Sequence, residues 1–197
     1  MNILLFGGFL GSGKTTTIMQ VARQITEERQ ETVAIIENEI GEVGVDDKLL
    51  KGCGIVVKPL FGGCVCCQIT SDLITAVNEI RETINPGWLI IEMTGLAVPG
   101  KVAETIKKYS TGADKIKNIT LVDASRWAEL REVLGPLIES QVEKSDVVIM
   151  NKVDIAGKDL DAKLQEVKEI AGAVPILVCN VNEKVPALLY REVFNLA

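Results

Sequence analysis

The chain has 197 residues, 47% of them hydrophobic and 24% charged, which is the balance of a globular protein with a core and excludes a disordered chain. This length fits one domain, which we expect to extend over residues 1–197. The net charge of −6 offers no cluster of Lys and Arg for a nucleic acid or an anionic membrane, so we expect neither as a partner.

The sequence also indicates the cellular location of the protein. No apolar run approaches the ~20 residues that span a bilayer, and the apolar N-terminus lacks the basic start and the cleavage site of a signal peptide. We therefore expect a cytoplasmic protein. In that reducing compartment, five cysteines favour a metal site or a catalytic role over a disulfide framework.

The first predicted elements are a buried strand over residues 2–6 and a helix over residues 15–29, and the segment between them fits the phosphate-binding pattern G-x-x-x-x-G-K-[ST]. In such a loop, backbone N–H groups converge on phosphate oxygens at the helix N-terminus. Lys14 would reach the β- and γ-phosphates, and the Thr15 hydroxyl would bind the Mg²⁺ that bridges them. A glycine-rich turn that binds nothing is the weaker alternative in this strand–loop–helix setting. The predicted nucleotide-binding residues of the loop are Gly8, Gly11, Ser12, Gly13, Lys14, Thr15 and Thr16.

A second strand is predicted over residues 31–36, because its continuous apolar run is typical of a strand covered on both faces. It leads into an acidic, glycine-punctuated segment, residues 37–47. That segment is either a solvated loop or a switch. We favour the switch, because nucleotide switches in such folds keep a segment that responds to the γ-phosphate at this place.

A third strand, residues 54–60, leads into a loop with three thiols within four residues. Soft thiolates select Zn²⁺, Cu⁺ or Fe–S over Mg²⁺, and a helix beginning just beyond the loop lowers a thiol pKa toward the metal-binding form. A fourth ligand would come from Cys53, an acidic side chain, water or a second protomer. Buried structural cysteines and a redox pair are the alternatives, and Cys179, in an apolar strand, is interpreted as a core residue. The predicted metal ligands are Cys64, Cys66 and Cys67.

Strands and helices alternate along the rest of the chain. Helices are expected over residues 70–84, 101–109, 133–144 and 159–170 and from 192 onward, and strands over 88–91, 116–122, 146–150 and 175–178. This alternation predicts an α/β fold with a mainly parallel sheet flanked by helices on both faces. Ligands of such sheets bind beyond the carboxyl ends of the strands, so the loops that follow the strands should share one rim.

Glu92 comes directly after the hydrophobic strand over residues 88–91. A carboxylate at that place beside a phosphate loop orients Mg²⁺ or its waters. The alternative is a surface acid at a strand end. The turn at Gly95 and the shared rim favour the magnesium role.

Asn151, Lys152 and Asp154 form an N-K-x-D motif after another apolar strand. One carboxylate can accept both the N1–H and the N2 amine of guanine, whereas adenine offers neither donor there. Binding ATP would leave Asp154 desolvated and unpaired, at a cost of about 1–3 kcal/mol or more. The stem of Lys152 can pack along the base. Alone, this motif is more often a solvated turn, but downstream of a phosphate loop it indicates guanine recognition.

The motifs together resemble the CobW/HypB/UreG family of GTPases, and the CobW branch most of all. The resemblance covers residues 1 to about 155. It implies a SIMIBI-class P-loop GTPase fold, binding of GTP or GDP with Mg²⁺, and a metal-handling role in which the cysteine cluster holds Zn²⁺, Co²⁺ or a related ion. It also implies that Glu39 and Glu92 lie near Mg²⁺ and the metal. The candidate catalytic residues are Lys14, Glu39, Asp46 and Glu92. The motifs that carry the resemblance are the phosphate loop, residues 37–46, 63–67 and 92–99, and the N-K-x-D motif.

Two departures from the family pattern stand out. CobW-type proteins usually carry a C-terminal domain, for which we expect no counterpart in these residues. Many relatives have histidine-rich stretches, whereas this chain has no histidine, so we do not expect it to store or deliver nickel through imidazole.

The sequence therefore predicts a Mg²⁺-dependent GTPase that couples its nucleotide state to a thiolate metal site and passes a metal or metallocofactor to a client protein. Two alternatives stay open: a GTPase that helps load or reactivate a corrinoid enzyme, and a nucleotide-dependent interaction module with a structural zinc. The resemblance also implies a homodimer promoted by GTP or metal, since a two-fold axis beside the cysteine loop would complete a three-thiolate site.

Overall fold

The computed structural model describes residues 1–37, 54–59, 68–183 and 187–194. In this part of the chain, seven strands form one sheet in the order β3-β2-β4-β1-β5-β6-β7, and every neighbouring pair is parallel. The predicted α/β fold with a mainly parallel sheet is confirmed. The strands are β1 (Asn2–Gly8), β2 (Val33–Glu37), β3 (Ile55–Pro59), β4 (Trp88–Glu92), β5 (Lys115–Asp123), β6 (Val147–Asn151) and β7 (Ile176–Val178).

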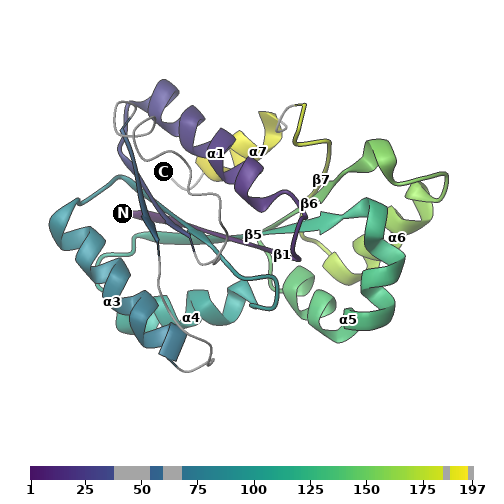
Figure 1. Ribbon diagram of the computed structural model, residues 1–197, viewed down its shortest axis with the longest axis horizontal. Helices are drawn as coiled ribbons and strands as arrows, with labels where there is room; N and C mark the ends of the chain where they lie inside the picture. Colours follow the sequence, from purple (N-terminus) through teal and green to yellow (C-terminus); the bar gives the residue numbers. More distant parts are fainter. Residues whose placement is uncertain (38–53, 60–67, 184–186, 195–197) are drawn as a thin grey trace.

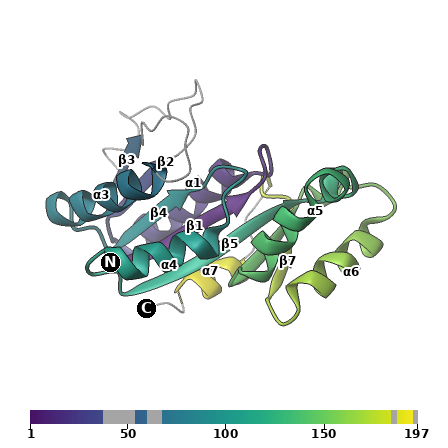
Figure 2. The same ribbon diagram turned by 90° about the horizontal axis from the view of Figure 1, so that it is seen from below.

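Helices cover both faces of the sheet (Figure 1). One face carries α1 and α7, and the other carries α3 and α4 at one end and α5 and α6 at the other (Figure 2). The helices are α1 (Lys14–Gln24), α3 (Gln68–Thr83), α4 (Pro99–Tyr109), α5 (Trp127–Glu143), α6 (Leu160–Ala171) and α7 (Ala187–Phe194). Among the described residues, no helix is long and apolar enough to cross a membrane.

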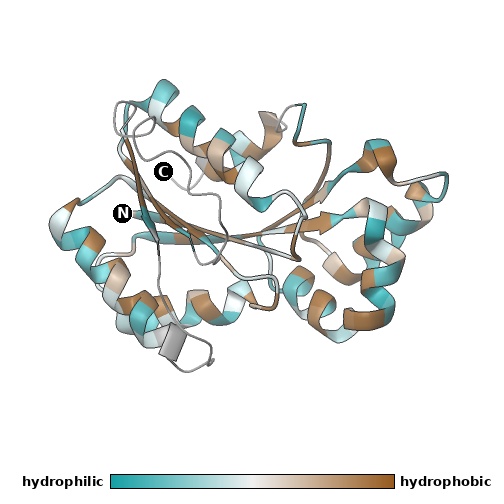
Figure 3. Ribbon diagram, viewed as in Figure 1, coloured by the Kyte–Doolittle hydropathy of each residue, from teal (hydrophilic) through white to brown (hydrophobic). Residues whose placement is uncertain are grey.

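The core lies in two layers because side chains alternate across each strand. In β1, Leu4 and Phe6 pack toward α1 and α7, while Ile3 and Leu5 pack toward α3 and α4. All four are fully buried, which explains why the strand is continuously apolar. The strands are accordingly hydrophobic along most of their length, whereas hydrophobic and hydrophilic residues alternate along the helices (Figure 3).

Helix α5 begins at Trp127, earlier than the predicted start at residue 133. Its backbone leaves the helical region at Leu134 (φ −128°, ψ 22°), two residues before Pro136. The ring of a proline inside a helix clashes with the preceding turn, so the chain kinks there and resumes. Trp127 and Leu130, before the kink, are buried and hold the first half of the helix on the sheet. The predicted helix over residues 133–144 therefore covers mainly the half that follows the kink.

Two other helix predictions need correction. The helix expected over residues 15–29 is α-helical only as far as Gln24, and its last turn, Ile25–Arg29, is a π-helix. The C-terminal helix starts at Ala187 rather than at residue 192, because Leu189 and Val193 are fully buried against the face that carries α1.

The carboxyl ends of the central strands lie at one edge of the sheet, as predicted. Across β1 and β4, Phe6 pairs with Glu92, and across β5 and β6, Asp123 pairs with Asn151. The phosphate loop leaves the sheet at the end of β1, at this same edge. The loops between the ends of these strands therefore form the place where a ligand can bind.

Candidate functional site

The segment between β1 and α1 has the backbone of a phosphate-binding loop. Gly13, just before α1, has a φ of +101°, which strains any residue with a side chain. A Cβ there would also lie 2.4 Å from the Asn151 Nδ2 atom. A Cβ at Gly8 would lie 2.2 Å from the Leu121 carbonyl oxygen. Glycine at both positions allows the loop to pack against the ends of the neighbouring strands.

The side chain of Lys14 folds back over this loop. It is 3% exposed, and its Nζ donates a hydrogen bond of 3.3 Å to the carbonyl oxygen of Phe9. A cavity of about 430 Å³ opens beside it, within the roughly 300–1,000 Å³ typical of small-ligand pockets. Its lining residues are Leu10, Gly11, Gly13, Lys14, Thr15, Thr16, Glu92, Asn151, Lys152 and Asn182. The predicted phosphate loop, the acid at the end of β4 and part of the N-K-x-D motif thus surround one cavity.

Thr15 and Glu92 meet in the wall of this cavity. The Thr15 hydroxyl donates to Glu92 Oε1 at 2.9 Å and lies 3.1 Å from Oε2, and Glu92 is only 4% exposed. Because the hydroxyl donates its proton to the carboxylate, a lone pair of Thr15 Oγ1 can still bind a cation. A hydroxyl and a carboxylate oxygen are ligands that suit Mg²⁺. These two residues therefore fit the magnesium role predicted from the sequence.

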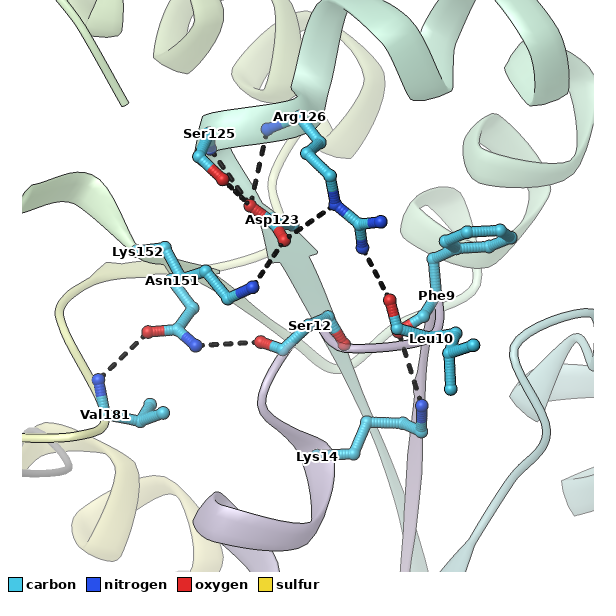
Figure 4. Close-up of polar contacts among 10 residues, drawn as sticks. All are labelled: Phe9, Leu10, Ser12, Lys14, Asp123, Ser125, Arg126, Asn151, Lys152 and Val181. Atoms are coloured by element: carbon cyan, nitrogen blue, oxygen red, sulfur yellow. Dashed lines mark hydrogen bonds and ion pairs between the residues drawn. The ribbon is translucent and has the colours of Figure 1, made fainter. Parts of the chain in front are cut away.

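The amide of Asn151 holds the site together from inside. Its Nδ2 donates to the Ser12 carbonyl oxygen at 2.7 Å, and its Oδ1 accepts from the backbone N–H of Val181 at 2.9 Å. It thereby ties β6 to the phosphate loop and to the segment after β7 (Figure 4). The same segment brings Asn182 to the cavity wall, a residue that the sequence analysis missed.

The other two residues of the N-K-x-D motif differ in their surroundings. Lys152 lines the cavity and has a φ of +61°, a left-handed conformation that is uncommon for a residue with a side chain. Asp154 lies in the short helical turn Val153–Ile155, is exposed, and is not among the residues that line the cavity. The base-reading role of Asp154 stays a prediction.

A buried carboxylate that was not among the predicted site residues, Asp123, lies next to the site. Asp123 accepts hydrogen bonds from Lys152, Ser125 and Arg126 (Figure 4). Burial alone raises the pKa of Asp123, but the hydrogen bonds from Lys152 and Ser125 and the charge of Lys152 outweigh it, so the pKa lies below its ordinary value. Asp123 is therefore ionised at neutral pH. An acid at the end of a strand, on the predicted rim, was the signal for it in the sequence.

The segment that follows Glu92 is fixed from the side of α5. Gln141 is buried, and its Nε2 donates to the carbonyl oxygens of Gly95 (3.0 Å) and Ala97 (2.7 Å). A Cβ at Gly95 would lie 3.1 Å from the backbone nitrogen of Leu10, so this segment also packs against the phosphate loop. Helix α5, the segment after β4 and the phosphate loop are thus in direct contact.

Several predicted site residues lie outside the described part of the chain: Glu39, Asp46, Cys64, Cys66 and Cys67. Within the described ranges, no group of three or more His, Cys, Asp or Glu side chains could hold a metal ion. Cys179, expected in a strand, comes directly after β7 and is half-buried against the core, and burial raises its pKa to about 11.

Comparison with known proteins agrees with this geometry. The model of the CobW/HypB/UreG nucleotide-binding domain matches residues 2–178. The zinc chaperone YjiA of Escherichia coli (strain K12) is 33% identical over 164 residues, which are 79% of this chain and 50% of YjiA. The crystal structure of Zn(II)-bound YjiA GTPase from E. coli aligns with a TM-score of 0.60 and 28% identity, covering 89% of this chain and 56% of that one.

The fold extends to a more distant protein. Hydrogenase maturation factor HypB from Archaeoglobus fulgidus aligns with a TM-score of 0.71 and 16% identity, over 99% of this chain and 88% of that chain. This likeness shows the fold alone. The chain spans about half the length of the curated relatives it matches, 50% of YjiA and 49% of the zinc chaperone YeiR.

Proposed function

Because the chain belongs to the CobW/HypB/UreG family, we propose that it is a Mg²⁺-dependent GTPase that couples its nucleotide state to a cysteine metal site and hands the metal to a client metalloprotein. The family match shows that the chain contains a CobW/HypB/UreG nucleotide-binding domain, and the likeness to YjiA GTPase supports GTP as the nucleotide that it hydrolyses. The observation that carries the proposal is the cavity in which Lys14, Thr15 and Glu92 converge.

The end of the cavity beside the phosphate loop is suited to the phosphates of a nucleoside triphosphate with Mg²⁺. The N–H groups at the start of α1 and the Lys14 ammonium supply positive charge for the phosphates. Thr15 and Glu92 would hold Mg²⁺, which neutralises charge on the phosphates. Glu39 and Asp46 complete the proposed acidic groups of the site, by the family resemblance alone.

The base end of the cavity is suited to guanine in this proposal. Asn151 anchors the start of the N-K-x-D motif to Ser12 and Val181. The aliphatic stem of Lys152 can pack along the base, because Lys152 lines the cavity. Asp154, three residues after Asn151, reads the N1–H and N2 donors of guanine. Its exposed position leaves the carboxylate accessible to a base that enters from solvent.

The metal side of the proposal rests on the sequence of the cysteine loop and on the relatives. Cys64, Cys66 and Cys67 supply three thiolates, which suit Zn²⁺ and also Co²⁺. Zinc is favoured, because YjiA is named a zinc chaperone and its GTPase has been crystallised with Zn(II). The metal is the cargo of the protein, and a metal chaperone implies a client protein that receives it. A cytoplasmic location and a homodimer promoted by GTP or zinc belong to the same proposal.

Turnover measured with and without zinc tests the proposal. We expect Mg²⁺-dependent release of phosphate from GTP, at a rate that zinc changes in the parent protein. The variant in which Cys64, Cys66 and Cys67 are all replaced by Ser should hydrolyse GTP at a rate that does not respond to zinc. A zinc response of the same, non-zero size in parent and variant would reject the cysteine metal site. A zinc-independent turnover in both would favour the interaction module with a structural zinc.

A further inference from the structure

One buried carboxylate beside the cavity has no role in the proposed function. Asp123 is 1% exposed and ends β5. Its Oδ1 accepts hydrogen bonds from the backbone N–H groups of Ser125 (3.0 Å) and Arg126 (3.3 Å) and from the Ser125 hydroxyl (2.6 Å). Its Oδ2 accepts from Lys152 Nζ at 2.8 Å and from Arg126 Nε at 3.2 Å. The two oxygens thus have separate sets of partners.

The contacts of Oδ1 are those of a helix cap. They satisfy the first N–H groups of the helical turn Ala124–Arg126, which leads into α5. Asn caps a helix about as well as Asp does, so this task does not require a negative charge. The contacts of Oδ2 are different, because both partners are cationic side-chain groups, Lys152 Nζ and Arg126 Nε, and neither group takes part in the cap.

The two cations connect Oδ2 to two loops that contribute residues to the cavity lining. Lys152 lines the cavity and belongs to the N-K-x-D motif. Arg126 donates through Nη2 to the carbonyl oxygen of Leu10, at 2.5 Å, and its Cζ lies 5.8 Å from the ring centroid of Phe9. Leu10 and Phe9 are residues of the phosphate loop. Figure 4 shows Asp123 between these two groups, so one carboxylate oxygen joins the base loop to the phosphate loop.

The backbone of Lys152 indicates that this residue is held in place. Its φ of +61° is unfavourable for a residue with a side chain and persists only where the surroundings fix it. The preceding residue, Asn151, is fixed by its bonds to Ser12 and Val181, and Lys152 is fixed by its ion pair with Asp123. Without the carboxylate, the ammonium of Lys152 and the guanidinium of Arg126 would repel each other and turn toward water.

We infer that Asp123 is a positioning residue for nucleotide recognition: its Oδ2 sets Lys152 along the base and, through Arg126, sets the phosphate loop. The inference rests on the proposed guanine site. It implies that base discrimination and phosphate binding weaken together when Asp123 loses its charge. Neither change follows if the carboxylate only caps the turn.

The variant Asp123→Asn separates these roles, since it keeps the capping oxygen and removes the charge. Dissociation constants for GDP and ADP are to be measured by titration calorimetry on protein shown to be folded by circular dichroism. We expect the affinity for GDP to fall roughly 10-fold or more, as for a lost charged hydrogen bond. The ratio of the ADP to the GDP dissociation constant, which measures the preference for GDP, should also fall. Folded Asp123→Asn protein with the GDP affinity and the preference of the parent would overturn the inference.

A matched control is Glu192→Gln. It removes a carboxylate from another partly buried ion pair with a lysine of this chain, Lys117 of β5, at 3.0 Å and away from the cavity lining. This variant should keep the GDP affinity and the preference of the parent. If it weakens both as much as Asp123→Asn does, loss of any such ion pair is the cause and the inference is wrong.

Lys152→Met tests the route through the lysine and leaves the cap of Asp123 intact. If Asp123 acts through Lys152, adding Asp123→Asn to Lys152→Met should leave the preference for GDP over ADP as it is in Lys152→Met alone. A further narrowing would overturn the route. If Asp123→Asn does not fold, Lys152→Met alone must narrow the preference, and an unchanged preference would overturn the inference.

Asp154→Ala distinguishes a failure of this inference from a failure of the proposed guanine site. A preference for GDP that survives Asp154→Ala would remove the guanine site, and with it the basis of the inference. A preference that depends on Asp154 but not on Asp123 would overturn the positioning role and leave the guanine site standing.

Discussion

The hydroxyl of Thr15 donates a hydrogen bond of 2.9 Å to the carboxylate of Glu92 and so joins the start of α1 to the carboxyl end of β4. The segment after Glu92 is in turn bonded to Gln141 of α5. A change at the phosphate loop therefore has a direct physical route to the segment after β4 and to α5.

Replacing Glu92 by Gln keeps the size of the side chain but removes its charge. We expect Mg²⁺-dependent GTP turnover to fall on the order of 10²-fold, the effect of removing one group that stabilises charge at a reacting centre. Phosphate release at a series of Mg²⁺ concentrations measures this. The control is Glu166→Gln, because Glu166 accepts a bond from Trp127 Nε1 and does not line the cavity. Turnover of Glu92→Gln at the parent rate would contradict the magnesium role.

Asp154 should decide the choice between guanine and adenine. Asp154→Ala removes the acceptor for two guanine donors, so we expect the preference for GTP over ATP to fall roughly 10-fold or more. Asp154→Asn replaces one acceptor by a donor and should shift the preference toward xanthine nucleotide. Competition binding with GTP, ATP and xanthosine triphosphate measures both effects, with Asp161→Ala, an exposed acid of α6, as the control. An undiminished preference in Asp154→Ala would refute the assignment.

Helix α7 should contribute to the stability of the domain. Leu189 is fully buried against the core, so Leu189→Ala should lower the free energy of unfolding by about 2–5 kcal/mol. Its neighbour Leu188 is 47% exposed, and Leu188→Ala should change the stability by less than about 0.5 kcal/mol. Urea unfolding followed by circular dichroism compares the two. Equal effects would mean that α7 does not pack as the structure has it.

Cys179 should be the least reactive thiol. Burial raises its pKa to about 11, so the thiolate is about one part in a thousand at pH 8, and its fraction grows tenfold with each pH unit up to about 11. The parent and Cys179→Ser should therefore show the same number of rapidly reacting thiols with a disulfide reagent at pH 8. After unfolding in guanidinium, the variant should show one thiol fewer. Loss of a rapidly reacting thiol in the native variant would contradict the buried position.

The central strands were predictable because both faces of the sheet are covered. A short, continuous apolar run such as residues 88–91 is typical of a strand that is buried on both faces. The structure has β4 at this place, and the strand is one residue longer than predicted. Helix α5 was predicted only in part, since Pro136 breaks its pattern and the packing of Trp127 holds the half before the kink. The start of α7 depends on burial against distant strands, which a short apolar stretch does not reveal.

The candidate site shows the same division. Residues inside a motif, such as Lys14 and Thr15, were predictable because the spacing of the loop dictates their neighbours. For Asp123 the sequence shows only an acid after a strand, because its bond to Lys152 depends on the fold. Gln141 was not predictable, because its partners Gly95 and Ala97 lie far along the chain. Asn151 was predicted as a nucleotide-binding residue, and the structure adds a second task, since its amide also ties the phosphate loop to Val181.

The central claim is that the nucleotide state controls the cysteine metal site. The most direct measurement is the zinc affinity of the protein with Mg²⁺ and either GDP or a non-hydrolysable GTP analogue, determined by competition with a chromophoric chelator. By linkage, two coupled sites change each other's affinity equally, and couplings between sites in proteins are typically about 5–150-fold. We predict a difference in zinc affinity of at least about fivefold between the two nucleotide states, abolished when Cys64, Cys66 and Cys67 are replaced by Ser. Equal zinc affinity in both nucleotide states would contradict the account.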